Sequence, residues 1–150
     1  MKWVMAALVF ALSGCGHLVV LNDPLTAAEH NDLGVAYERS GKSDLASREY
    51  KKALKKDHRF AVAHVNLGNL AAASGRWDEA ERRYRAALKI RPDDADAMNN
   101  LATTLLQRGT KLDEAERLAT QAVAAGGRDS LYQATLDEVR RARATSPERR

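Results

Sequence analysis

Apolar residues in the central part of the chain recur at intervals of three and four, the spacing of one face of a helix. Tyr84 and Leu88 are one such pair. Gly75 separates two stretches of this kind, and glycine is favoured where a helix ends in a left-handed conformation. Pro92 then stops the second stretch. The pattern predicts two helices joined by a short turn within residues 61–94.

Small and acidic residues support this hairpin. Gly68 and Ala80 stand on its two helices, where small side chains let helix axes approach closely. Asp78 and Glu79 fall in the first turn of the second helix, where the helix dipole favours negative charge. A single hairpin leaves its apolar face uncovered, so it needs neighbours stacked on it.

The flanking sequence supplies those neighbours at a step of 34 residues. The earlier copy, residues 27–60, has at matching places Leu33, Gly34, Tyr37, Gly41, Ala46, Tyr50, Ala53 and Leu54. The later copy, residues 95–127, has Leu101, Ala102, Leu105, Gly109, Ala115, Ala122 and Val123. It matches only with one residue inserted near Thr110 and Lys111. Ala119 replaces the tyrosine there, so we expect this third unit to be less well filled.

The order Leu67-Gly68, Gly75, Trp77, Ala80, Tyr84, Ala87-Leu88 and Pro92 resembles a tetratricopeptide repeat (TPR). The resemblance implies an all-α solenoid of antiparallel helical hairpins, with about three repeats and a C-terminal capping helix. We expect TPR 1 at residues 27–60, TPR 2 at 61–94, a degenerate TPR 3 at 95–127, the capping helix at 128–145 and a disordered tail at 146–150.

The sequence also predicts where the first helices lie and which residues of the last helix cover the third repeat. Asp23 is expected to be the N-cap of the first helix, with Pro24 at its first position. The second helix is expected over Ser43–Lys56. In the capping helix the positions expected to cover the third repeat are Leu131, Ala134, Leu136, Val139 and Ala142.

The first residues look like an export signal. Lys2 precedes a short apolar run, too short to span a bilayer, and Leu12–Cys15 resembles a bacterial lipobox. This resemblance implies a signal peptide at residues 1–14, a lipidated Cys15 bearing palmitate, and a tether at 15–26. Gly16 after the cysteine favours an outer-membrane lipoprotein facing the periplasm. An uncleaved anchor is the alternative, and Leu18–Leu21 could pack on either the membrane or the domain.

The net charge of +4 changes this picture little, because acidic residues are interleaved with the basic ones along the chain. The basic residues gather on the second helices of the first two repeats: Arg48, Lys51, Lys52, Lys55, Lys56, Arg82, Arg83, Arg85, Lys89 and Arg91. In TPR stacks these helices face the convex side, so a solvated surface is expected. Attraction to anionic lipid headgroups is the second interpretation. Nucleic-acid binding is not expected, because no aromatics interleave with the basic run.

No set of catalytic residues emerges from the sequence. It lacks a phosphate-binding glycine loop, a nucleophile elbow and Cys/His metal spacing. His30 and His64 are one repeat apart, but two ligands make a poor metal site, so we interpret them as packing residues. We expect no enzyme activity, cofactor, metal or small-molecule substrate.

A binding surface is therefore the predicted functional feature. In TPR domains the first helices of the hairpins line a concave groove for peptides, where amides can pair with a peptide backbone. The predicted groove residues are Asn31, Val35, Val65, Asn66, Asn69, Asn99, Asn100, Thr103 and Gln107. The subtype that holds chaperone tails with basic groove residues is not expected, since Val35 and Asp96 stand at its basic or amide places.

Two functions fit these predictions. The first is a lipid-anchored scaffold that holds a protein or peptide partner in the periplasm. The second is a pilotin-like assembly factor for an outer-membrane secretin or export complex. The sequence does not identify the partner.

Overall fold

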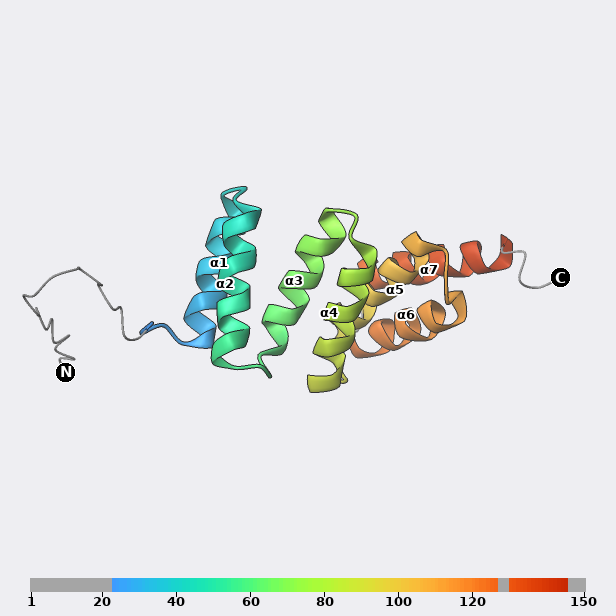
Figure 1. The fold of residues 1–150 in the computed structure, drawn as a ribbon. Helices are drawn as coiled ribbons and strands as arrows, with labels where there is room; N and C mark the ends of the chain where they lie inside the picture. Colours follow the sequence, from blue (N-terminus) through green and yellow to red (C-terminus); the bar gives the residue numbers. More distant parts are fainter. Residues whose placement is uncertain (1–22, 127–129, 146–150) are drawn as a thin grey trace, which may run out of the picture.

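The computed structural model describes residues 23–126 and 130–145, and these fold into helices without a strand. The helices are α1 (Ala27–Arg39), α2 (Ser43–Lys56), α3 (Ala61–Ala73), α4 (Trp77–Ile90), α5 (Ala95–Arg108), α6 (Leu112–Gly126) and α7 (Ser130–Thr145). Consecutive helices pair as antiparallel hairpins, and the hairpins follow one another along a single axis (Figure 1). This confirms the predicted all-α solenoid of three hairpins and a terminal helix. In the described part of the chain, no helix has the length and apolarity needed to cross a bilayer.

The turn inside each hairpin uses a left-handed glycine, as Gly75 shows with φ of 69°. In the third hairpin Gly109 ends α5 in the same conformation, and Lys111 adds a second left-handed residue with φ of 53°. L-residues adopt such angles rarely. The extra residue predicted near Thr110 and Lys111 is thus accommodated within the turn.

Each of the first two hairpins is held by a glycine packed against a tyrosine. A Cβ atom built on Gly68 would lie 2.6 Å from Cε1 of Tyr84, and Gly34 faces the ring of Tyr50 in the same way. Both tyrosines are fully or almost fully buried. Gly68 therefore permits close approach to the ring of Tyr84, and Ala80, also buried, packs in the same core cluster.

The start of α1 differs from the prediction. Thr26, not Asp23, is the N-cap, because the hydroxyl of Thr26 accepts from the Glu29 N–H while the Glu29 carboxylate accepts from the Thr26 N–H. This reciprocal arrangement is the capping box. Asp23 instead accepts from the Leu25 N–H and lies 2.8 Å from Nε2 of His30.

The capping helix α7 also covers the third hairpin with partly different residues. Leu131 is 60% exposed and Ala134 is exposed, whereas Tyr132 and Thr135 are buried beside Leu136 and Val139. The ring of Tyr132 lies where a Cβ on Gly126 would be, and its hydroxyl donates to Asp96 at 2.7 Å. Burial of the tyrosine thus sets the rotation of α7.

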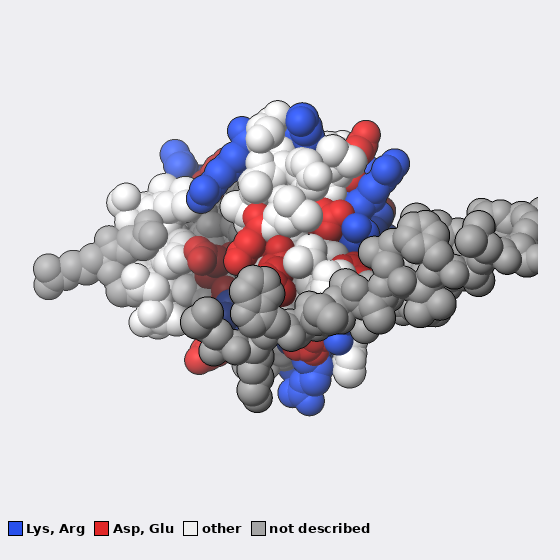
Figure 2. All heavy atoms as spheres, turned by 90° about the vertical axis from the view of Figure 1, so that its left-hand side faces the viewer, with Lys and Arg blue, Asp and Glu red and all other residues white. Residues whose placement is uncertain are grey.

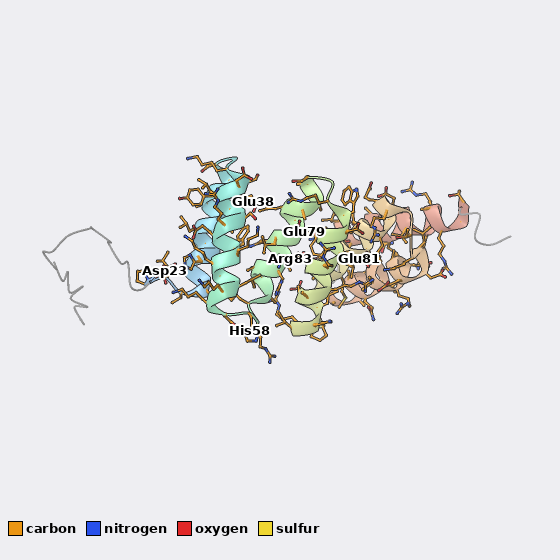
Figure 3. All side chains as sticks on the ribbon, viewed as in Figure 1. Asp23, Glu38, His58, Glu79, Glu81 and Arg83 are labelled. Atoms are coloured by element: carbon orange, nitrogen blue, oxygen red, sulfur yellow. The ribbon has the colours of Figure 1, made fainter. Side chains whose placement is uncertain are left out.

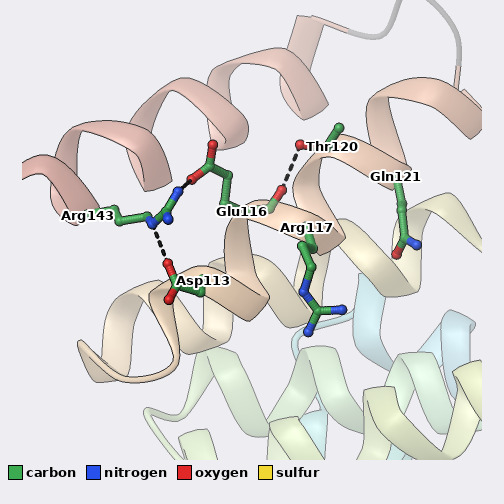
Figure 4. A pocket seen from close by; sticks show the side chains of 6 residues that line it. All are labelled: Asp113, Glu116, Arg117, Thr120, Gln121 and Arg143. Carbon is green, nitrogen blue, oxygen red and sulfur yellow. Dashed lines mark hydrogen bonds and ion pairs between the residues drawn. The ribbon is translucent and has the colours of Figure 1, made fainter.

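An arginine held by two carboxylates joins successive units at two junctions. Arg108, at the end of α5, lies 2.7 Å from Asp78 and also pairs with Glu81, both on α4. Arg143, at the end of α7, pairs with Asp113 and Glu116 on α6, and Figure 4 shows these side chains around a hollow of about 480 Å³. We call this arrangement the arginine clamp.

The first junction, between the first and second hairpins, lacks an arginine clamp. The corresponding places hold Ser74, Asp44 and Ser47, which line a polar hollow of about 430 Å³. Among the described residues, no ion pair joins the first hairpin to the second. Their contact consists of an apolar cluster that includes Tyr50, Leu67 and Leu70, and one amide pair described below.

Candidate functional site

Amide side chains link the first helices of successive hairpins. The Asn66 amide on α3 donates to Oδ1 of Asn31 on α1 at 2.9 Å, and the Asn100 amide on α5 donates to Oδ1 of Asn69 on α3 at 3.1 Å. Oδ1 of Asn69 also accepts from the Tyr84 hydroxyl at 2.8 Å. Part of the hydrogen-bonding capacity of these amides is therefore used to hold the stack together.

A hollow of about 400 Å³ opens beside these amides, between the second and third hairpins. We call it the central hollow. Its lining residues are Val62, Val65, Asn66, Asn69, Arg91, Asp94, Asp96 and Asn100. They come from α3, from the turn before α5 and from the first turns of α5. The central hollow thus offers amide groups, two valines and three ionisable groups.

Local structure fixes the charged groups of the central hollow. Asp94 is the N-cap of α5, where it accepts from the Ala97 N–H at 3.0 Å, and it also pairs with Arg91. Asp96 lies in the first turn of α5, where the helix dipole favours its charge. Its carboxylate accepts the hydrogen bond from Tyr132, and the residue is exposed.

The structure brings four of the predicted groove residues together in the central hollow: Val65, Asn66, Asn69 and Asn100. Asn31 reaches it only through its bond to Asn66 and is itself buried. The others lie elsewhere. Val35 packs against the apolar cluster that includes Tyr50 and Leu67. The Thr103 hydroxyl donates to the Asn99 carbonyl oxygen of its own helix, and Gln107 is exposed further along α5. Their roles as partner contacts stay predictions.

The position of Asn99 differs most from the one expected of a groove residue. Its side chain is 3% exposed, and its Oδ1 atom has no hydrogen-bond partner within the described ranges. Four lining residues were not among the predicted groove residues, namely Val62, Arg91, Asp94 and Asp96. Val62 could have been found, because it stands one repeat before Asp96 and occupies the same helix place.

The basic second helices form a separate surface. Lys52 pairs with Glu49 at 2.8 Å, Lys56 donates to the carbonyl oxygen of Asp23, and Arg85 bridges Glu81 and Glu114. Seen from the N-terminal end, Asp and Glu gather toward the middle while most Lys and Arg lie nearer the edges (Figure 2). Acidic neighbours therefore neutralise part of this surface.

Glu81 is the most heavily paired carboxylate of α4, where Figure 3 labels it beside Arg83. It is buried and accepts from Arg85, Arg108 and Lys111. Burial by itself raises the pKa of Glu81, but the hydrogen bonds from Lys111 and Arg85 outweigh it and leave the pKa below its ordinary value. Glu81 is therefore charged at neutral pH and stabilises the junction.

The two repeated histidines pack inside separate hairpins. His30 is 1% exposed, with Nδ1 2.8 Å from Glu49. His64 is half-buried, and burial, followed by repulsion from Arg83, lowers its pKa below the ordinary value. The described residues contain no group of three or more His, Cys, Asp or Glu arranged to hold a metal ion. Cys15 lies outside the described residues.

Comparison with known proteins identifies the repeat. Two family models, each described as tetratricopeptide repeat, match residues 59–126 and 31–80. A search among curated proteins finds no match.

Solved structures with this fold include two TPR domains of RPAP3 and one of Sgt2. The first TPR of Spaghetti (RPAP3), bound to the HSP90 peptide SRMEEVD, has a TM-score of 0.75 and 19% identity over 79% of this chain and 94% of its own. The second TPR domain of human RPAP3, in complex with an HSP70 peptide, has a TM-score of 0.70 and 19% identity over 76% and 94%. The Sgt2 TPR domain from Aspergillus fumigatus has a TM-score of 0.72 and 17% identity over 79% of each chain. Residues 31–126 of the chain therefore belong to the tetratricopeptide-repeat family, whose solenoid of helical hairpins the structure shows.

Proposed function

We propose that this protein is a protein–protein interaction module that binds an extended segment of a partner in the groove formed by α1, α3 and α5. The central hollow carries this proposal, because it combines amide groups with apolar surface at the junction of two repeats. TPR domains with the same fold bind peptides of HSP90 and HSP70, which supports a peptide or protein as the ligand.

The chemistry of the lining residues suits a peptide backbone. An amide side chain carries two N–H donors and a carbonyl acceptor, so Asn66 and Asn100 retain bonding capacity beyond the single bond that each donates within the stack. Val62 and Val65 supply apolar surface for a neighbouring side chain. A backbone group buried there without a partner would cost about 1–3 kcal/mol, so the amides favour a segment whose backbone pairs with them.

We also propose that the module is held at a membrane through Cys15, as a lipoprotein of the outer membrane facing the periplasm. The support for this part is the Leu12–Cys15 sequence after a short apolar run. The alternative role, a pilotin-like assembly factor, uses the same groove and anchor and differs only in the partner. Failure of a secretin to assemble in cells lacking the protein would favour that role.

The decisive experiment is affinity capture from solubilised cell envelope. The double variant Asn66→Ala/Asn100→Ala removes two lining amides and should reduce capture of the partner without loss of helicity. The matched control is Gln121→Ala/Gln133→Ala, which removes two exposed amides from α6 and α7. Circular dichroism of both variants separates loss of binding from loss of fold. Undiminished capture by a folded Asn66→Ala/Asn100→Ala protein would contradict the proposal.

A further inference from the structure

The charge of the central hollow is unbalanced. Of the three ionisable residues in its lining, Arg91 and Asp94 form an ion pair with each other. Among the described residues, no cation pairs with Asp96. Its carboxylate accepts a hydrogen bond from the neutral hydroxyl of Tyr132. The lining as a whole therefore carries one negative charge, and Asp96, which is exposed, is the residue that carries it.

Corresponding residues in the other repeats carry the same negative charge along the groove. Four residues of α3 line the central hollow: Val62, Val65, Asn66 and Asn69. A shift of one repeat gives the corresponding residues of the first and third hairpins: Ala28, Asn31, Asp32, Val35, Asp96, Asn99, Asn100 and Thr103. The only charged residues at these places are Asp32 and Asp96, both exposed. The first two repeats instead carry most of their cations on their second helices. An anionic ligand in the groove would thus be repelled by these carboxylates, because no cation stands at the corresponding helix places.

We propose that the groove selects a partner segment that carries a lysine or arginine, and that Asp96 receives this cationic side chain. The inference rests on the proposed function and adds the chemical class of the ligand to it. The cationic head lies against the Asp96 carboxylate, its aliphatic stem lies against Val62, and the neighbouring backbone pairs with Asn66 and Asn100. A segment with an acidic residue at that place is disfavoured by like charge.

The variant Asp96→Asn tests this with little structural change. The side-chain carbonyl oxygen of asparagine can still accept from the Tyr132 hydroxyl, while the charge is lost. The matched control is Asp93→Asn, which removes an exposed charge from the same turn outside the lining. The probes are three libraries of fluorescent peptides that are identical except for lysine, glutamine or glutamate at one central place. Fluorescence anisotropy gives the dissociation constants.

Lysine peptides should bind the wild type about fivefold more tightly than glutamine peptides, the upper range for an exposed ion pair, and glutamate peptides should bind most weakly. Asp96→Asn should remove the lysine advantage, so that lysine and glutamine peptides bind with similar dissociation constants, whereas Asp93→Asn should retain the advantage. Added salt should reduce the lysine advantage.

The outcomes separate this inference from the proposed function. If glutamine peptides bind and lose affinity with Asn66→Ala/Asn100→Ala, but lysine gives no advantage, the groove binds peptides and the inference is wrong. Stronger binding of glutamate peptides, or a lysine advantage that persists in Asp96→Asn, would also overturn it. Binding by none of the three libraries, together with unchanged envelope capture by the asparagine variant, would overturn both proposals.

Discussion

Substitution of Gly68 perturbs the contact on which the central hairpin depends. Even Gly68→Ala would bring its Cβ to 2.6 Å from Cε1 of Tyr84 and to 2.9 Å from two further ring atoms. Carbon atoms in contact are normally about 3.5–4.0 Å apart, so the ring or the helix must move. Tyr84 is 2% exposed, and its hydroxyl is bonded to Asn69. The ring is therefore enclosed by the core and held at its hydroxyl.

The size of the effect follows from opposing contributions. Overpacking a core costs about 1–3 kcal/mol, and displacement of the ring weakens a hydrogen bond worth about 0.5–1.5 kcal/mol. Replacing glycine within a helix returns about 0.5–1 kcal/mol. The steric cost is the larger, so Gly68→Ala should lower the free energy of unfolding by about 1–3 kcal/mol. Gly68→Leu should lie at the upper end of this range or beyond it.

Urea and thermal unfolding followed by circular dichroism measure the effect. Ala73→Leu is the matched control, because Ala73 is an exposed residue on the same helix, and it should leave stability almost unchanged. In a double-mutant cycle, Tyr84→Leu should remove most of the cost of Gly68→Ala, since it removes the ring that the new methyl group meets. A melt of Gly68→Leu indistinguishable from wild type would show that Gly68 is not at a packed interface, and no coupling to Tyr84 would refute the steric explanation.

Three further predictions concern charge and the anchor. Because the folded-state pKa of Glu81 is lowered from 4.5, its contribution to stability is complete above that value and is lost as pH falls through the folded pKa. Urea midpoints of Glu81→Gln should thus be lower than those of wild type at neutral pH and less pH-dependent below about pH 5, and parallel acid profiles would contradict this. Cys15→Ser should take up no labelled palmitate, whereas an unlabelled wild type that retains Met1 would rule out the lipoprotein. Reversal of Lys51, Lys52, Lys55 and Lys56 to glutamate should alter salt dependence or sedimentation with anionic vesicles while partner capture continues, and loss of capture instead would place binding on the second helices.

Local sequence signals predicted the hairpins well, because each depends on residues close together in the chain. The spacing of Tyr84 and Leu88, the turn glycine Gly75 and the span of α2 are of this kind. The N-cap was misassigned even though its signal is local: Thr26 and Glu29 form the capping box, and the proline after Asp23 drew the prediction three residues too early.

The candidate site was less predictable, because its geometry depends on how the repeats stack. The sequence places asparagines on the first helices, but the pairing of Asn66 with Asn31 and of Asn100 with Asn69 joins residues 35 and 31 apart. Those offsets depend on how the hairpins stack, which the repeat length alone does not specify. The rotation of α7 was mispredicted for a similar reason, since it depends on the fit of Tyr132 against Gly126.

The missing arginine clamp has a mechanical consequence. At the second junction, rupture must separate Arg108 from two carboxylates as well as the apolar core, and at the last junction the same holds for Arg143. Across the first junction, the described residues supply an apolar cluster and the Asn66–Asn31 bond, without an arginine clamp. A pull applied between the two ends of the solenoid therefore meets the least resistance between α2 and α3. Under load the first hairpin would detach as a unit, and the two hairpins that enclose the central hollow would remain joined.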